Sequence, residues 1–288
     1  DFTVNALYYC PISQKIVGHK DGMKHIHEKS IVSIGDPVKR FSEDPVRSLR
    51  AIRFSNKLDF KIDKDIKEAI YEKGHLLSDI SNARLFDEFC KIFLSGMAEK
   101  NFNKLSSYGL SKYLISTDSE RSEFTRNLIV ESLRNTDKRL INGQSITPGF
   151  LIAALLWPGL IERSLSKGEI NLRKFFRSMD YVLRNQQKIT AVPRKFQSYI
   201  KDIWVLQLKL HSRIGKQPYK TLKHPRFRAA YDLLLLRERA TNKKQDLGKW
   251  WTDFQKNDEN IKKALINDLK EKNMQETPKI FGFSEELR

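Results

Sequence analysis

Apolar residues recur at helical spacing along most of this chain, and this periodicity limits the folds that it can adopt. The clearest case runs from Arg84 to Gly96, where apolar side chains lie three or four residues apart and a glycine ends the run. Such spacing places the apolar side chains on one face of an α-helix, and glycine is common just after a helix C-terminus. The sequence therefore predicts a mainly α fold.

Similar segments cover much of the remaining chain. We expect helices near residues 63–76, 84–94, 102–108, 121–134, 148–156, 172–188, 193–210, 227–239 and 260–272. Two short strands are expected near residues 2–9 and 31–34, where the helical spacing is absent. The polar stretches 117–123 and 213–223 are interpreted as loops.

A further helix with a row of arginines is predicted to begin near Asp44. Pro45 suits the first helical position because it has no N–H to leave unpaired, and Asp44 before it suits the N-cap. Arg47, Arg50 and Arg53 then recur at every third residue and share one side of the helix. Guanidinium groups this close favour an anion among them, and phosphate is a frequent one. On spacing alone, pairing with surface carboxylates is the simpler interpretation.

Two motifs resemble those of a known family. The chain begins Asp1-Phe2-Thr3-Val4-Asn5-Ala6-Leu7, and Glu43-Asp44-Pro45-Val46-Arg47-Ser48-Leu49-Arg50 follows about forty residues later. Together they resemble the catalytic core of the nucleotidyltransferase family that contains bacterial poly(A) polymerases and tRNA CCA-adding enzymes. The first segment alone is explained equally well by a short strand that buries Phe2, Val4 and Ala6. The pair of motifs at the family's separation favours the resemblance.

The resemblance implies roles for individual residues. Asp1 would be a catalytic carboxylate near the ribose and triphosphate. Asp44 and Arg47 would hydrogen-bond the edge of the incoming base, because an acceptor beside a two-pronged donor matches adenine. The same pair could re-orient to read cytosine. Three further residues would bind ATP or brace its pocket: Asn5, Arg50 and Arg53.

The resemblance also implies a division into three parts. Residues 1–37 would be the last strands of an α/β nucleotidyltransferase head, and residues 38–115 a helical neck with the nucleotide-recognition helices. Residues 116–288 would form a helical body with a basic, RNA-binding tail. Arg84 and Glu88 would brace the neck, although a plain core helix explains them nearly as well. The length of 288 residues independently favours two or more compact units.

Magnesium is implied as a cofactor, but this chain has few of the expected ligands. In the family, an Asp-x-Asp pair beside a glycine-rich loop holds two Mg²⁺ ions, in a head that precedes Asp1. Neither pattern occurs here, since Asp63-Lys64-Asp65 lacks a glycine loop and is interpreted as a helix start. His19, His25 and His27 lack suitable partners, so we assign no metal ligand and expect a polar loop. We therefore expect a fragment of a longer polypeptide that is inactive alone.

The composition favours a cytoplasmic protein. The two cysteines, Cys10 and Cys90, are far apart in a basic chain, which is typical of reduced thiols. The longest apolar stretch, residues 150–157, precedes Pro158 and is too short to cross a bilayer. We expect it to form a buried helix, and we expect no membrane partner.

The positive charge is concentrated toward the C-terminal end. The formal net charge is +18, and residues 171–288 hold 27 Lys and Arg against 13 Asp and Glu. Binding of a polyanion explains this concentration, because each neutralised phosphate releases condensed counterions. General solubility does not explain why the charge lies at one end. The distribution therefore favours contact with RNA.

The distal sequence favours one branch of the family. Residues 224–237 and 249–255 resemble the tail of the poly(A) polymerase branch, and the His-Asp pairs of some CCA-adding relatives are absent. Arg226 and Arg228 would bind single-stranded RNA or be ordinary surface residues, whereas Trp250 and Trp251 are expected in the core. The implied reaction is template-independent addition of AMP from ATP to RNA 3′ ends. The alternatives are a tRNA CCA-adding nucleotidyltransferase and an inactive RNA-binding fragment.

Overall fold

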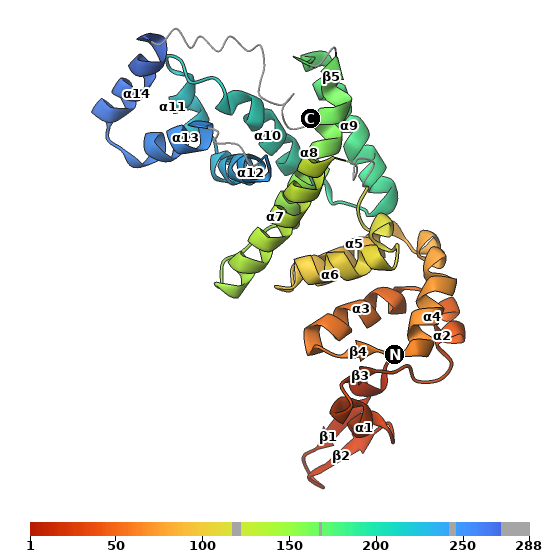
Figure 1. Ribbon diagram of the computed structural model, residues 1–288. Coiled ribbons are helices and arrows are strands. Elements are labelled where there is room, and N and C mark those ends of the chain that lie inside the picture. Colours follow the sequence, from red (N-terminus) through yellow and green to blue (C-terminus); the bar gives the residue numbers. More distant parts are fainter. Residues whose placement is uncertain (117–121, 167–168, 242–245, 272–288) are drawn as a thin grey trace. The chain divides into compact units, whose positions relative to one another are not determined.

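The computed structural model describes residues 1–116, 122–166, 169–241 and 246–271. The chain divides into two compact units. Unit 1 comprises Asp1–Ile115, Leu140–Asn142 and Gln187–Ala191, and unit 2 comprises Ser116–Arg139, Gly143–Gln186 and Val192–Arg288. Most described residues are helical, which confirms the predicted mainly α fold (Figure 1). Within the described ranges, no helix combines the length and the apolar character needed to span a membrane.

Unit 1 begins with a hairpin instead of the single strand predicted over residues 2–9. A 3₁₀ turn at Thr3–Asn5 interrupts the extended chain after Phe2, which forms an isolated bridge to Ser33. The strand β1 (Leu7–Cys10) then pairs antiparallel with β2 (Lys15–Gly18). Gly18 permits this close approach, because a Cβ at this position would lie 2.0 Å from the carbonyl oxygen of Ala6.

The rest of unit 1 is mainly helical. Its helices are α1 (Gly22–His27), α2 (Pro37–Glu43), α3 (Val46–Leu58), α4 (Lys64–Lys73), α5 (Asn82–Phe93) and α6 (Ala98–Ser107). The strand β3 (Ser30–Ile31) is shorter than predicted and pairs in parallel with β4 (Lys61–Ile62). The prediction of a polar loop around the three histidines is wrong, because α1 forms most of that segment. Asp63 caps α4 by accepting from the Asp65 N–H at 3.0 Å, which confirms a helix start there.

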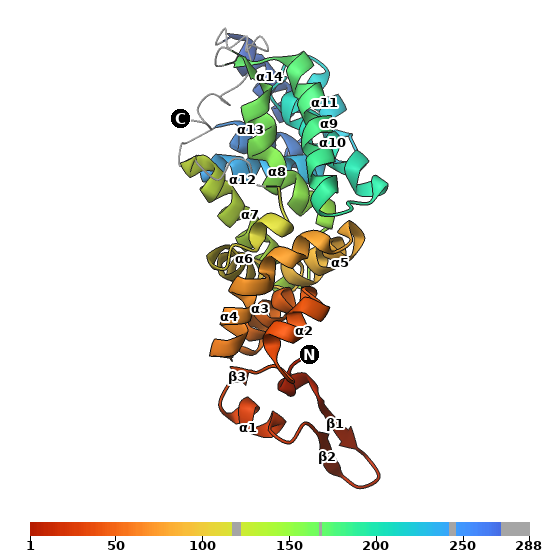
Figure 2. The same ribbon diagram turned by 90° about the vertical axis from the view of Figure 1, so that its right-hand side faces the viewer.

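The arginine-bearing helix α3 is held by its apolar side. Val46, Leu49 and Ile52 are at most 1% exposed, as expected for the apolar row of this helix. The helix packs against α5 and α6, and its N-terminal end lies close to the first residue of the chain (Figure 2). Burial of these three side chains fixes the rotation of α3 about its axis, so the arginine side has a defined direction.

Unit 2 is a set of helices with one two-residue hairpin, β5 (Leu165–Ser166) with β6 (Glu169–Ile170). The helices are α7 (Glu123–Ile141), α8 (Pro148–Ser164), α9 (Leu172–Ile189), α10 (Arg194–Leu210), α11 (Gln217–Leu222), α12 (Phe227–Ala240), α13 (Asp246–Lys256) and α14 (Glu259–Glu271). The helix α10 lies between α8 and α12 and packs against both (Figure 1).

Several helices of unit 2 differ from the predictions, and α7 ends at Ile141 instead of near residue 134. The helix α8 continues through Pro158, because the apolar side chains around the proline are buried and their packing offsets the lost hydrogen bond. The helix α11 occupies much of the loop predicted over 213–223, and α13 lies where no helix was predicted. Part of the other predicted loop, residues 117–121, lies outside the described residues.

The tryptophan pair of α13 belongs to the core, as the sequence predicted. Trp251 is fully buried and Trp250 is 7% exposed. The indole N–H of Trp251 donates to the Leu210 carbonyl at 2.8 Å, so its polar atom is satisfied. Both rings contact Phe254 in the same apolar cluster. Neither tryptophan is therefore placed to stack on RNA.

Candidate functional site

The N-terminal segment is fixed beside β3 and α3. The carbonyl of Asp1 accepts from the Ile34 N–H at 3.1 Å, and the Thr3 N–H donates to the Val32 carbonyl at 3.0 Å. Phe2 is fully buried and meets the Phe54 ring edge-on, with ring centroids 6.1 Å apart. These contacts place the carboxylate of Asp1 at the arginine side of α3.

The carboxylate of Asp1 lies between two of the predicted arginines. Arg47 donates from Nε to Oδ1 at 3.1 Å, and Arg50 approaches Oδ2 with Nη2 at 2.5 Å. The side chains of Asp1 and Arg47 are 15% and 14% exposed, so the pair is mostly removed from water. The structure thus brings together Asp1, Arg47 and Arg50, which were predicted for the site. The anion beside the two guanidiniums is the carboxylate of Asp1.

Arg47 is held by two more acceptors. Its Nη1 donates to the Arg40 carbonyl at 2.6 Å and to Oε2 of Glu43 at 3.4 Å. Glu43 also accepts from Arg40 at 2.7 Å. These hydrogen bonds involve Nε and Nη1 of Arg47, and none of them involves Nη2. A guanidinium fixed in this way presents its remaining donors in one direction.

Asp44 is fixed at the start of α3 by a residue from a distant helix. Its Oδ2 accepts from Nη2 of Arg84, on α5, at 2.7 Å. Its Oδ1 accepts from the Val46 N–H at 3.3 Å, so it caps the first turn although the helix starts one residue later than predicted. The Arg47 N–H donates to the Asp44 carbonyl at 3.1 Å, which keeps the two predicted base-reading residues within one turn.

Arg53 lies in a different environment from Arg47 and Arg50. Its guanidinium carbon is 4.6 Å from the centroid of the Phe54 ring, which also contacts Phe2. Burial lowers the pKa of Arg53, while the charge of Glu88 acts in the opposite direction. Glu88 is 3% exposed and forms an ion pair with Lys91 at 2.8 Å. The guanidinium of Arg53 therefore lies against an aromatic ring of its own helix, a ring that Arg50 also approaches at 5.7 Å.

The described part of the chain does not form a magnesium site alone. No group of three His, Cys, Asp or Glu side chains within it is arranged to hold a metal ion. Both carboxylate oxygens of Asp1 contact guanidiniums, whereas Mg²⁺ requires oxygen ligands arranged octahedrally around it. Asn5 lies exposed in the 3₁₀ turn.

The two arginines predicted to bind RNA are both exposed at the start of α12. Arg228 pairs with Asp232 through two contacts, Nη2 to Oδ1 at 3.0 Å and Nε to Oδ2 at 3.3 Å. The guanidinium carbon of Arg226 lies 5.0 Å from the centroid of the Tyr199 ring. Both side chains are accessible, but a carboxylate already neutralises one of them.

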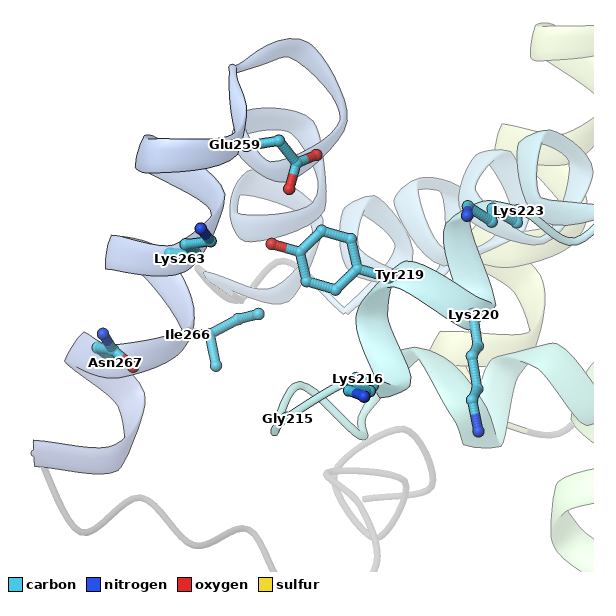
Figure 3. Close-up of a pocket in the computed structure, with 9 residues that line it drawn as sticks. All are labelled: Gly215, Lys216, Tyr219, Lys220, Lys223, Glu259, Lys263, Ile266 and Asn267. Carbon is cyan, nitrogen blue, oxygen red and sulfur yellow. The ribbon is translucent and has the colours of Figure 1, made fainter.

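A basic pocket in unit 2 was missed in the sequence analysis. Four lysines contribute to its lining: Lys216, Lys220, Lys223 and Lys263. Figure 3 shows Lys216 and Lys263 on either side of Tyr219 and Ile266, with Lys220 and Lys223 farther along α11. The sequence contained a signal, because Lys216, Lys220 and Lys223 are four and three residues apart and share one side of a helix. The polar character of this stretch led to its interpretation as a loop.

Several solved structures share the arrangement of helices in this chain. The Bacillus stearothermophilus CCA-adding enzyme in complex with CTP covers 93% of this chain and 58% of its own, with a TM-score of 0.53. Its sequence identity is 21%, so the likeness concerns the fold. The described helices of this chain therefore share the fold of part of that enzyme.

Sequence comparisons identify the branch. Residues 59–117 match the model described as the probable RNA and SrmB-binding site of polymerase A, and residues 167–280 match the polymerase A arginine-rich C-terminus. Poly(A) polymerase I of Haemophilus influenzae is 38% identical over 279 residues, and the CCA-adding enzyme of Lactococcus lactis IL1403 is 28% identical over 240. These matches support a partial poly(A) polymerase-family protein.

The matched relatives are longer than this chain. The alignment with the Haemophilus influenzae protein covers 93% of this chain and 62% of the relative, and the alignment with the Lactococcus lactis protein covers 83% and 54%. The activity, substrates and partners of those whole proteins are therefore not carried over directly to the 288 residues.

Proposed function

We propose that this chain selects the nucleotide and holds the RNA in an enzyme that adds AMP from ATP to RNA 3′ ends without a template. The observation that carries this proposal is the cluster of Asp1, Asp44 and Arg47, together with the matches to the poly(A) polymerase family. Because each side chain of the cluster is held by at least one partner, the site is organised in advance of binding.

In this proposal, Asp44 and Arg47 read adenine. The remaining donors of Arg47 would reach a ring nitrogen, and a carboxylate oxygen of Asp44 would accept from the exocyclic amino group. Arg84 holds Asp44 in position at 2.7 Å and leaves it acceptor capacity, since each carboxylate oxygen has two lone pairs. Arg50 would bind the triphosphate. Its contact with Asp1 would fix the direction of its guanidinium. Asn5 would contribute a polar contact on the nucleotide side.

We propose that Mg²⁺ is held by carboxylates outside the 288 residues, while Asp1 orients Arg47 and Arg50 beside the triphosphate. When bound, the ions would stabilise the negative charge of the reacting phosphates. The support for this proposal is that the alignment covers only 62% of the Haemophilus influenzae relative. We also propose a cytoplasmic location. Cys10 and Cys90 are free thiols, and the cytoplasm keeps thiols reduced.

The alternative activity is CCA addition to tRNA. The observation in its favour is the 28% identity to the Lactococcus lactis CCA-adding enzyme over 83% of this chain. The match to the Haemophilus influenzae poly(A) polymerase I is stronger, at 38% over 93% of the chain. We therefore rank AMP addition first. The two activities share nucleotide selection, and they differ in the length and composition of the product.

The proposal is tested by joining the chain to the part of the Haemophilus influenzae relative that the alignment does not cover. The fused protein is incubated with an oligoadenylate primer, ATP and Mg²⁺, beside the 288-residue chain alone. We expect extension by the fusion and none by the chain alone. A fusion that binds primer and ATP but never extends the primer would contradict the proposed reaction. Extension by the chain alone would place the metal-binding carboxylates within the 288 residues.

A further inference from the structure

Four lysines that line one pocket of unit 2 have no carboxylate partner. Within the described residues, none of the side chains of Lys216, Lys220, Lys223 and Lys263 forms an ion pair. Lys262, next to Lys263 on α14, is by contrast paired with Glu259 at 3.4 Å. Like charges gathered without a counter-ion repel one another, so this arrangement favours an external anion.

The pocket is also hollow and partly apolar. Its volume is about 640 Å³, which lies within the range of roughly 300–1,000 Å³ for ligand pockets. Tyr219 and Ile266 form its apolar part, and Figure 3 shows the Ile266 side chain directed toward the tyrosine ring. Tyr219 is braced from behind by Phe254, edge-to-face, with ring centroids 5.3 Å apart. An aromatic surface beside several cations suits a ligand that has both a flat base and phosphates.

One carboxylate of the lining, Glu259, does not neutralise the four lysines. Its Oε1 lies 3.4 Å from Nζ of Lys262, whose ammonium is also 5.9 Å from the Phe254 ring centroid. The four lysines thus leave the pocket with a net positive charge after Glu259 is counted. By contrast, Asp232 holds Arg228 through two contacts. Arg228 therefore shares a carboxylate partner with Arg139, whereas the four lysines have none among the described residues.

We propose that the lysine pocket binds a nucleotide unit of single-stranded RNA, with its lysines on the flanking phosphates and Tyr219 against the base. The inference rests on the proposed function, since it names the place where unit 2 holds the RNA substrate. The pocket is distinct from the cluster around Asp1, which belongs to unit 1. Sequence-tolerant binding is expected, because every base has a face that can stack on an aromatic ring.

The test compares two double variants with the same change in charge. Lys216→Glu with Lys263→Glu alters the pocket, whereas Lys195→Glu with Lys209→Glu alters exposed lysines on α10. Binding of a fluorescent oligoadenylate to the 288-residue chain is followed by anisotropy from low to moderate salt. We expect at least a tenfold loss of affinity and a shallower salt dependence for the pocket variant, against less than threefold for the control.

Equal losses in the two double variants would overturn the inference, because only the overall charge would then matter. The proposed AMP addition would survive that result, since it is measured separately by primer extension. If the unchanged chain bound no oligoadenylate, the RNA-binding part of the proposed function would fail together with the pocket. Competition with inorganic phosphate and with AMP distinguishes an RNA site from a site for a free anion. Displacement of the bound oligoadenylate by inorganic phosphate at a concentration equal to that of the oligoadenylate would also overturn the inference.

A second measurement uses the unchanged chain and avoids any effect of substitution on folding. Amine-reactive acetylation followed by mass spectrometry reports the accessibility of each lysine with and without oligoadenylate. We expect bound RNA to slow the labelling of Lys216 and Lys263 several-fold and to leave Lys195 unchanged. Unchanged labelling of the pocket lysines at saturating RNA would contradict the proposal.

Discussion

Arg47 donates from Nε to Oδ1 of Asp1 at 3.1 Å and thereby joins two segments that lie 46 residues apart. Arg50 contacts the other oxygen of the same carboxylate. One aspartate thus sets the direction of two guanidiniums on α3. The contact also explains why the two motifs belong together, since each one positions the other.

The first prediction concerns this aspartate. Replacing Asp1 by Asn removes the charge that holds two arginines, and the N-terminal segment should open more easily. For a mostly buried ion pair we expect a local loss of about 1–3 kcal/mol. Hydrogen exchange of the Ile34 and Thr3 amides, which bond this segment to its neighbours, should then be about five to a hundred times faster.

A matched control is Glu68→Gln. Glu68 is 65% exposed and pairs with Lys64 at 3.6 Å, so its loss should change stability by about 0.5 kcal/mol or less. Exchange at Ile34 should be unaffected in this variant. If Asp1→Asn behaved like the control, the Asp1 carboxylate would have no role in positioning the segment.

The second prediction concerns nucleotide choice in the fused enzyme. Arg47→Ala should lower kcat/KM for ATP, because a base-reading hydrogen bond is lost. The expected loss of transition-state binding is about 2–4 kcal/mol. Asp44→Ala should act similarly and reduce the preference for ATP over CTP. The control is Arg177→Ala, an exposed residue of α9, which should leave kcat/KM unchanged. Wild-type selectivity in both site variants would show that other residues read the base.

The third prediction concerns a buried arginine in unit 2. Arg237 is 2% exposed, donates to Oε1 of Gln207 at 2.8 Å and lies 4.6 Å from the Trp157 ring centroid. Arg237→Ala should lower the free energy of unfolding by about 2–4 kcal/mol, since a buried acceptor loses its donor. Arg239→Ala should cost about 1 kcal/mol or less, because Arg239 is 52% exposed. Urea denaturation measures both, and equal effects would contradict the role given to Arg237.

The fourth prediction concerns pH. Burial, together with the charges of Arg237 and Arg213, lowers the pKa of His211 to about 3. The unfolded value is about 6.5, so below that pH the unfolded chain binds a proton that the folded chain does not. Stability should therefore fall as pH decreases from 6.5 toward 3, by about 1.4 kcal/mol per unit at most from this group.

The variant His211→Gln tests this dependence. Its stability should change less between pH 6.5 and 4.5 than that of the unchanged chain. His75→Gln serves as the control, because His75 is exposed and its replacement should keep the original dependence. An identical pH dependence in all three chains would show that His211 is not held neutral by burial.

The sequence predicted the fold well where periodic burial controls it. The helices α9, α10 and α12 begin and end within one or two residues of their predicted bounds, because their apolar faces are regular. The start of the chain was predicted less well. There, a 3₁₀ turn and a close backbone approach at Gly18 produce a hairpin that alternation alone does not reveal. The predicted end of α8 before Pro158 was wrong, because burial of the surrounding side chains outweighs the tendency of proline to end a helix.

The candidate site was predictable as a set of residues but not as a set of contacts. The motifs placed Asp1, Asp44 and Arg47 together, and the structure does bring them to one end of α3. The pairing of Asp44 with Arg84, 40 residues away, depends on how α5 packs. The pairing of Arg228 with Asp232 was visible as a four-residue spacing on one helix.

The central claim is that this chain gives its enzyme the specificity of a poly(A) polymerase. The most direct measurement is the length and composition of the products that the fused enzyme forms on an RNA primer in equimolar ATP and CTP. The account predicts a ladder of AMP additions that continues well beyond three nucleotides and contains little cytidine. A product that stops after the addition of two cytidines and one adenosine would contradict it and identify a CCA-adding enzyme.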